Sequence, residues 1–178
     1  TGVQTCALPI SNAIYNSPGD IQWFVTDYDV KKDTKLKQDL GIMERNFRKL
    51  IKYAFLNVPD WWKQRIPADV KEKATRMKSE HDNAPVLRGQ TDYELIEFID
   101  FPDIRKIITE KRNWDEIFSK IFPKNQKDNF RFKMEELEVL RNHIYHNRVL
   151  GEIDSSRFAV YYDDIMKFIN SYARKDQI

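Results

Sequence analysis

Apolar residues recur at intervals of three and four positions along most of this chain, which is the spacing of one face of an α-helix. The first such series follows Asp33 or Thr34, either of which can cap a helix, and ends at Asn57-Val58-Pro59. Its members are Leu36, Leu40, Met43, Phe47, Leu50 and Ala54. Only 5 of the 178 residues are glycine, which favours helices over a turn-rich all-β fold.

The same spacing predicts further helices, separated by prolines, capping residues and turn signals. Asp60 is expected to cap a short segment with Trp61 and Trp62, and Asn113-Trp114-Asp115 to interrupt a helix. The other predicted helices are a polar one over residues 68–80 after Pro67, one from a Thr91 cap through Tyr93 to Ile99, one opened by Pro102, one over residues 126–147 that Gly151 stops, and one from an Asp154 cap to Ile169. The sequence therefore predicts an all-α fold, a bundle of about four main helices with short helical inserts.

We expect this helical domain to occupy residues 33–178. Residues 1–11 read as the translation of a common sequencing-adapter oligonucleotide, so we interpret them as an artefact that takes no part in the fold. Residues 12–32 are expected to be a linker or the remnant of a preceding region. Within them, residues 21–30 are rich in β-branched and aromatic side chains, which predicts a short strand.

Charge and cysteine content limit the possible chemistry. The net charge is only +2, which gives weak support for a polyanionic partner. The one cysteine, Cys6, lies in the adapter-like segment, so we expect a reducing compartment, the cytoplasm. No apolar run approaches the roughly 18 residues of a membrane helix, so no membrane partner is expected. The acidic residues form no recognisable metal cluster, and the sequence predicts neither a metal nor another cofactor.

The predicted helix over residues 126–147 has two apolar faces when it is drawn at about 100° per residue. Met134, Leu137, Leu140 and Ile144 form the first face, which is expected to enter the core. The second face contains Phe132 and Val139 together with Glu135, Asn142 and His146. A second face with Phe and Val requires a partner, which is either another helix of the chain or the same helix of a second copy.

The end of this helix, residues 140–150, reads LRNHIYHNRVL and carries the candidate catalytic residues. The fork of donors on Arg141 suits phosphate oxygens, and His146 can exchange protons near neutral pH. Asn142 is one turn before His146 and can fix the imidazole orientation. Together they can cleave RNA without metal, because the ribose 2′-OH attacks the phosphate while Arg141 stabilises the charge and His146 moves the proton. Cations also gather at helix C-termini because the helix dipole favours them, and that alternative explains the same residues without chemistry.

Several neighbours are candidates for substrate contacts. His143 can be a second acid or base, Tyr145 can stack on a base, and Arg148 can hold a second phosphate. Glu44, Arg45 and Arg48 in the first predicted helix can flank the cleft, with Arg48 as a further candidate for substrate binding. Each has an equally simple alternative as an exposed or packed side chain. On one straight helix Arg141 and His146 lie about 140° apart, so they meet only if the helix frays or if Arg141 acts across a dimer axis.

The stretch from Arg141 to His146 resembles the R-x4-H motif of the HEPN superfamily, including the polar residue after the arginine. MERNFRKLI, DWWKQRIPADVKEKA and FIDFPDIRKIITEKRNWDEIFSKIF are similar, in this order, to segments of a bacterial subgroup of HEPN domains. The resemblance covers residues 34–171. It implies a helical bundle and a homodimer whose motif helices face one another across one composite cleft.

The resemblance further implies a metal-independent endoribonuclease, with Arg141 and His146 catalytic, Asn142 supporting them, and Phe132 and Val139 on the dimer face. Many relatives are toxins or effectors in defence against phage, so an antitoxin or a regulatory domain is an expected partner beside RNA. Some relatives lack catalysis, which leaves a second hypothesis, a dimerisation or nucleic-acid-sensing module of a larger, for example ATPase-containing, protein. A third hypothesis is a helical scaffold with no nucleic-acid ligand.

Overall fold

The computed structural model describes residues 27–84 and 92–175, and there it confirms the all-α class. The long helices are α1 (Asp27–Ala54), α3 (Ala68–Asp82), α6 (Lys127–Tyr145) and α7 (Glu152–Lys175). The shorter helices are α2 (Trp61–Arg65), α4 (Phe101–Thr109), α5 (Lys111–Glu116) and the 3-10 turns η3 (Leu95–Phe98), η4 (Phe118–Lys120) and η5 (Lys124–Gln126). Four main helices with short inserts match the expectation from the sequence, although α4 takes a larger share of the core than α3.

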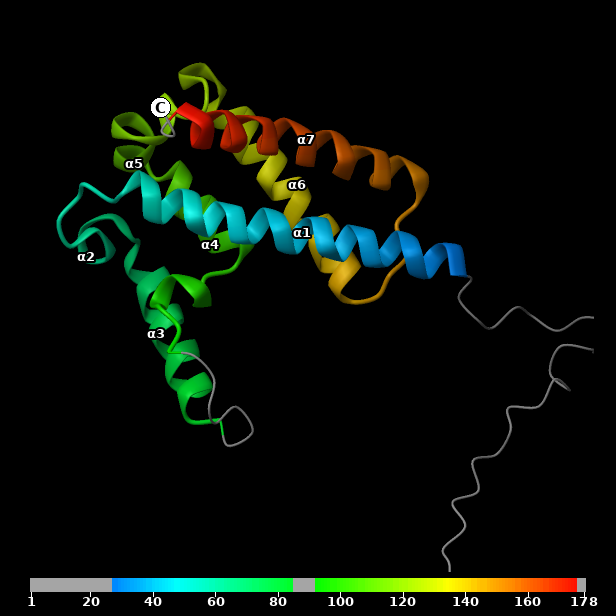
Figure 1. Cartoon of the computed structure of the whole chain (residues 1–178), viewed down its shortest axis with the longest axis horizontal. Helices are drawn as coiled ribbons and strands as arrows, with labels where there is room; N and C mark the ends of the chain where they lie inside the picture. The colour runs from blue at the N-terminus through cyan, green and yellow to red at the C-terminus, as the bar shows by residue number, and fades with distance from the viewer. Residues whose placement is uncertain (1–26, 85–91, 176–178) are drawn as a thin grey trace, which may run out of the picture.

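Helices α1, α6 and α7 each contact the other two, and α4 closes the bundle against α1 and α6. Figure 1 shows α1 and α7 side by side and running in the same direction, with α6 passing behind them. The α3 helix packs against η3 and extends away from α7 (Figure 1). This arrangement brings the C-terminal end of α6 next to the first half of α1, where the candidate site lies.

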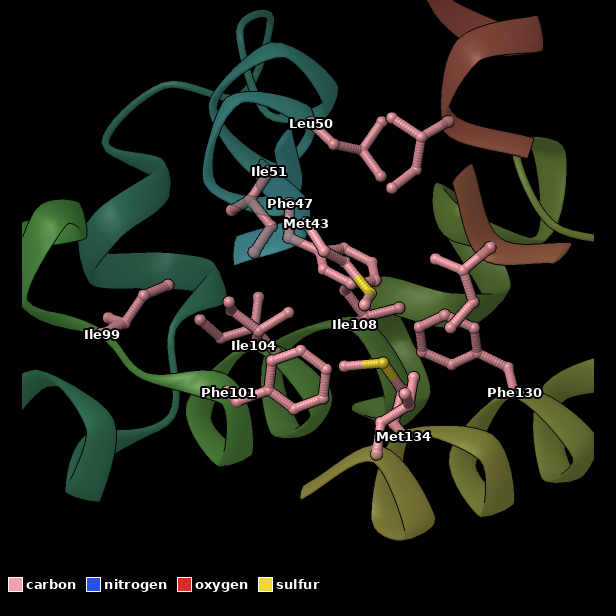
Figure 2. Close-up of a cluster of buried hydrophobic side chains, with 14 of the residues drawn as sticks. Met43, Phe47, Leu50, Ile51, Ile99, Phe101, Ile104, Ile108, Phe130 and Met134 are labelled. Atoms are coloured by element: carbon pink, nitrogen blue, oxygen red, sulfur yellow. The ribbon is translucent and has the colours of Figure 1, made fainter. Parts of the chain in front are cut away.

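The core forms where the predicted faces of α1 and α6 meet α4. Phe47 on α1 is fully buried and contacts Phe101 and Phe130 edge to face, with both pairs of ring centroids 6.2 Å apart. Met134 of α6 lies in the same cluster, as Figure 2 shows. Edge-to-face aromatic pairs add to the free energy of burial, so this cluster fixes how the three helices cross.

Lysine 73 joins α3 to the start of α4. The side chain of Asp100 accepts from the backbone N–H of Asp103 and the side chain of Asp103 accepts from that of Asp100, a capping box that starts α4. The Lys73 ammonium donates to Asp100 at 2.5 Å and to Asp103 at 2.8 Å. Partial burial lowers the pKa of Lys73, but the two carboxylates outweigh burial and hold its pKa above the ordinary value.

We expect Lys73→Met to lower the free energy of unfolding at pH 7 by about 1–2 kcal/mol, because it leaves the buried carboxylate of Asp103 and the partly buried carboxylate of Asp100 without their cation. A raised folded-state pKa stabilises the fold fully below the unfolded value of about 10.4 and loses this effect as the pH rises through the folded value. The difference between wild type and Lys73→Met should therefore shrink above about pH 10.5. Urea unfolding at pH 7 and at higher pH measures it, and a difference that stays constant contradicts the assignment.

Several predicted element boundaries are wrong. Helix α1 begins at Asp27, six residues before the predicted cap, so residues 27–30 are helical and not a strand; residues 21–26 lie outside the described residues. Asp60 adopts a left-handed conformation with φ 48° and makes no side-chain cap. Tyr93 is not helical and the predicted Thr91 cap is outside the described residues. Asp154 lies inside the first turn of α7, which begins at Glu152.

The predicted break at Asn113-Trp114-Asp115 is also wrong, because these residues form the middle of α5. The chain turns at Glu110 instead, whose side chain accepts from the backbone N–H of Asn113. The amide of Asn113 is fully buried and donates to the carbonyls of Arg65 and Ile107. Asparagine in a helix interior is unfavourable on its own, and here tertiary hydrogen bonds compensate for that preference.

Candidate functional site

The candidate residues lie on α6 and just after it. Asn147 adopts a left-handed conformation with φ 55°, and the N–H groups of Asn147 and Arg148 donate to the carbonyls of Ile144 and His143 at 3.1 and 2.9 Å. This is the Schellman arrangement, which ends a helix by satisfying its last carbonyls. The helix therefore ends at Tyr145, and Gly151, predicted to stop it, lies directly before α7 instead. His146 is consequently the residue at the helix cap.

Both predicted faces of α6 are confirmed. Met134, Leu137, Leu140 and Ile144 are buried. Phe132 is 53% exposed and Val139 is 59% exposed, which is high for large apolar side chains. Glu135, Asn142 and His146 are exposed as well. The second face of α6 is thus uncovered by any described part of the chain.

Arg141 lies on the side of α6 that faces α1, about 160° round the helix from Val139. Its Nε donates to Oε1 of Glu44 at 3.1 Å, and its Nη1 donates to Oδ1 of Asn142 at 3.3 Å. The guanidinium also lies 4.7 Å from the centre of the Tyr145 ring, a cation–π contact. Glu44 is 8% exposed, so its carboxylate is a buried anchor. The arginine is therefore fixed in position beside Asn142.

His146 is not brought to Arg141. Its backbone N–H donates to the carbonyl of Asn142 at 3.1 Å, but no described side chain makes a hydrogen bond or ion pair with its exposed imidazole. The helix does not fray at this point, because the Schellman bonds close it. Within one chain the three predicted catalytic residues therefore form an Arg141–Asn142 pair and a separate His146.

Some of the neighbouring candidates contact other residues of the chain, and others are exposed. Arg48 donates from Nε and Nη2 to the carbonyl of Ile99 at 3.2 and 2.8 Å and lies 3.7 Å from Glu44, so it ties α1 to the start of α4. Tyr145 is 45% exposed, with Arg141 against its ring. Arg148 is exposed beyond the helix end, and no described carboxylate pairs with it.

His143 lines a hollow of about 300 Å³ between α6 and the start of α7. Phe132 and Val139 line the same hollow, together with Arg157 and Asp154 of α7. His143 is therefore turned towards α7, whereas Arg141 is turned towards α1. Within one chain, His143 and Arg141 therefore do not face the same phosphate position.

Two residues of α1 belong to the site although the motif did not point to them. Glu44 anchors Arg141, and the Lys37 ammonium donates to the side chain of Asn147 at 2.5 Å. For Glu44 a signal was available, since it lies between the core residues Leu40 and Phe47 and so at the border of the buried face. For Lys37 there was none, because its partner depends on where α6 ends.

Glu44→Gln is expected to lower the free energy of unfolding by about 1–2 kcal/mol, because it leaves the guanidiniums of Arg141 and Arg48 without their carboxylate. The shape of the side chain is retained, so the loss reports charge. Chemical denaturation measures it. As a matched control, Glu80→Gln removes an exposed partner of Arg76 on α3 and should change stability by less than about 0.5 kcal/mol. Equal effects of the two substitutions would contradict a special role for Glu44.

Comparison with known proteins gives no relative: no protein-family model, no curated protein and no solved structure matches this chain. Among the described residues no group of three or more His, Cys, Asp or Glu side chains is placed to hold a metal ion. None of the described helices is long and apolar enough to cross a membrane.

Proposed function

We propose that this protein is a metal-independent endoribonuclease of the HEPN type that acts as a homodimer in the cytoplasm. One observation carries the proposal: α6 exposes His146 and Asn142 on the same face as Phe132 and Val139, and the preceding residue, Arg141, is fixed on the side of α6 that faces α1. A catalytic pair and an uncovered apolar surface on one helix are what a composite site between two copies needs.

The dimer explains why Arg141 and His146 lie apart on one chain. In a two-fold interface, residue i of one copy meets residue j of the other, and the reverse contact forms as well. If Phe132 and Val139 of the two copies pack together, the two helix ends are brought over each other's surface. Two further apolar side chains, Ile153 and Val160 of α7, are 77% and 56% exposed. Burying such side chains stabilises an interface by roughly 25 cal/mol per Å² before the costs of association.

The chemistry follows from the groups present. The 2′-OH of the ribose attacks the adjacent phosphorus and the bond to the 5′-oxygen breaks, which leaves a 2′,3′-cyclic phosphate and a 5′-hydroxyl. Arg141 stabilises the negative charge that develops on the phosphate oxygens. His146 moves the proton between the attacking and leaving oxygens, and Asn142 orients it. DNA is not cleaved because it lacks the attacking hydroxyl.

Purified protein in EDTA, incubated with transfer RNA and with a DNA oligonucleotide, tests the proposal. We expect cleavage of RNA alone, with 2′,3′-cyclic phosphate ends and a dimer in sedimentation. Intact RNA under these conditions would refute the enzymatic proposal.

We further propose a role as a toxin or an effector in phage defence, held in check by an antitoxin or a regulatory domain.

A second candidate function is a non-catalytic dimerisation or nucleic-acid-sensing module. The intramolecular contacts of Arg141 favour it, because Glu44, Asn142 and Tyr145 already engage the guanidinium. This function predicts dimers that bind RNA and leave it intact, so the same experiment separates the two.

A further inference from the structure

Glycine 41 lies in the interior of α1, where glycine destabilises a helix relative to alanine. A Cβ atom added at Gly41 would lie 3.3 Å from Nη1 of Arg45 and 4.0 Å from its Cζ. The Arg45 side chain therefore folds back by one turn, and its guanidinium occupies the space that a side chain at position 41 would take. A side chain at position 41 would therefore crowd this guanidinium.

Arg45 also differs from most arginines of the chain in having no counter-ion. Among the arginines whose side chains the structure describes, only Arg45 and Arg148 have no described carboxylate within ion-pair distance. An exposed arginine without an acid is available to an anion from outside.

Arg148 follows the contact between α1 and the end of α6, and Arg45 lies two helical turns further along α1. Lys37 of α1 bonds to Asn147, and Arg148 is the next residue in the chain. Gly41 and Arg45 follow Lys37 at successive intervals of four residues, so the three lie along one side of α1. Glu44, also on this side, has its carboxylate paired with Arg141 and Arg48. The strip Lys37–Gly41–Arg45 is therefore cationic and borders the end of α6.

We propose that the strip Lys37–Gly41–Arg45 binds backbone phosphates of the RNA, next to the phosphate that Arg141 contacts. The inference rests on the proposed function for its ligand class, and it adds a binding strip on α1 that the motif helix does not contain. The guanidinium fork and the ammonium supply donors for phosphate oxygens, and the bare backbone at Gly41 lets the fork lie flat on the helix.

The test measures binding of a fluorescent 2′-O-methyl RNA oligonucleotide, which has no free 2′-OH and so stays intact whatever the catalytic activity. Arg45→Gln should weaken binding about fivefold to tenfold and reduce the slope of log affinity against log salt by about 1. The matched control is Arg76→Gln on α3, an exposed helical arginine with only a 3.9 Å contact to Glu80, which should bind as wild type does.

Gly41→Gln separates a binding role from a structural one. The Cβ of an alanine would move the Arg45 guanidinium by only a few tenths of an ångström, whereas the longer glutamine side chain competes for the same space. Glutamine is a better helix former than glycine, so the melting temperature should rise while binding weakens. Unchanged binding by both Gly41→Gln and Arg45→Gln overturns this inference and leaves the proposed function standing. Failure of the wild type to bind this RNA overturns the inference, and the cleavage of ordinary RNA then decides the proposed function separately. Arg45-dependent binding without cleavage of ordinary RNA supports the inference and refutes the nuclease.

Discussion

Replacing His146 with alanine is expected to reduce RNA cleavage by about 10²- to 10⁴-fold, the usual contribution of a positioned acid or base. The exposed imidazole has no described side-chain partner, so its removal leaves no buried group unsatisfied. The Schellman end of α6 is made by backbone groups and should persist. Rates of RNA cleavage in EDTA measure the effect, with circular dichroism and sedimentation showing an intact helical dimer.

His81→Gln is the control for this experiment. His81 is at the end of α3, where its ring packs edge to face with Tyr93 and Phe98 at 5.4 and 5.5 Å. Cleavage by this variant should be close to that of wild type. A nuclease activity that survives His146→Ala belongs to another site or to a contaminant, and the proposed mechanism is then wrong.

Mixing the Arg141→Ala and His146→Ala variants, each inactive alone, is expected to restore part of the RNA cleavage. If Arg141 of one copy acts with His146 of the other, a heterodimer of Arg141→Ala and His146→Ala subunits contains one intact site and one doubly damaged site. Random exchange in a symmetric dimer makes half of the molecules heterodimers, so about one quarter of wild-type activity should return. The measurement is the cleavage rate after the two purified variants are mixed under conditions that allow subunit exchange.

The result distinguishes the two geometries of the site. If Arg141 and His146 of the same copy acted together, every subunit in the mixture would carry a damaged site, and activity would stay at the level of the separate variants. That outcome would require the end of α6 to rearrange on binding, because the two side chains do not contact each other within the chain.

Helical periodicity was sufficient to predict the all-α class and both faces of α6, because each depends only on local spacing. It also identified Phe132 and Val139 as a second apolar face that requires a partner, and the structure adds that no described part of the chain covers these two side chains. The ends of the elements were predicted less well. Gly151 was the obvious residue to end α6, but Asn147 adopts the left-handed conformation instead, and asparagine gives a weaker signal than glycine. Asn113 could not be placed in a helix because its hydrogen-bond partners come from another part of the chain.

The contacts around Arg141 could not be predicted from its motif. They depend on α1 lying against the end of α6, which is a property of the assembled bundle. The border position of Glu44 was visible in the sequence, but its partner was not. The partner of Arg48 could not be predicted either. The sequence suggested Arg48 as a substrate contact, whereas in the structure it donates to the carbonyl of Ile99.

The ion pair between Glu44 and Arg141 makes the orientation of this arginine a property of the whole bundle. Only Nε of the guanidinium bonds to Glu44, and Nη1 bonds to Asn142. An anion that reached the remaining donors would therefore meet a side chain that is already oriented, and would lose less rotamer entropy on binding. A change that separates α1 from α6 would free the arginine and remove this preorganisation, even though it leaves the arginine itself in place.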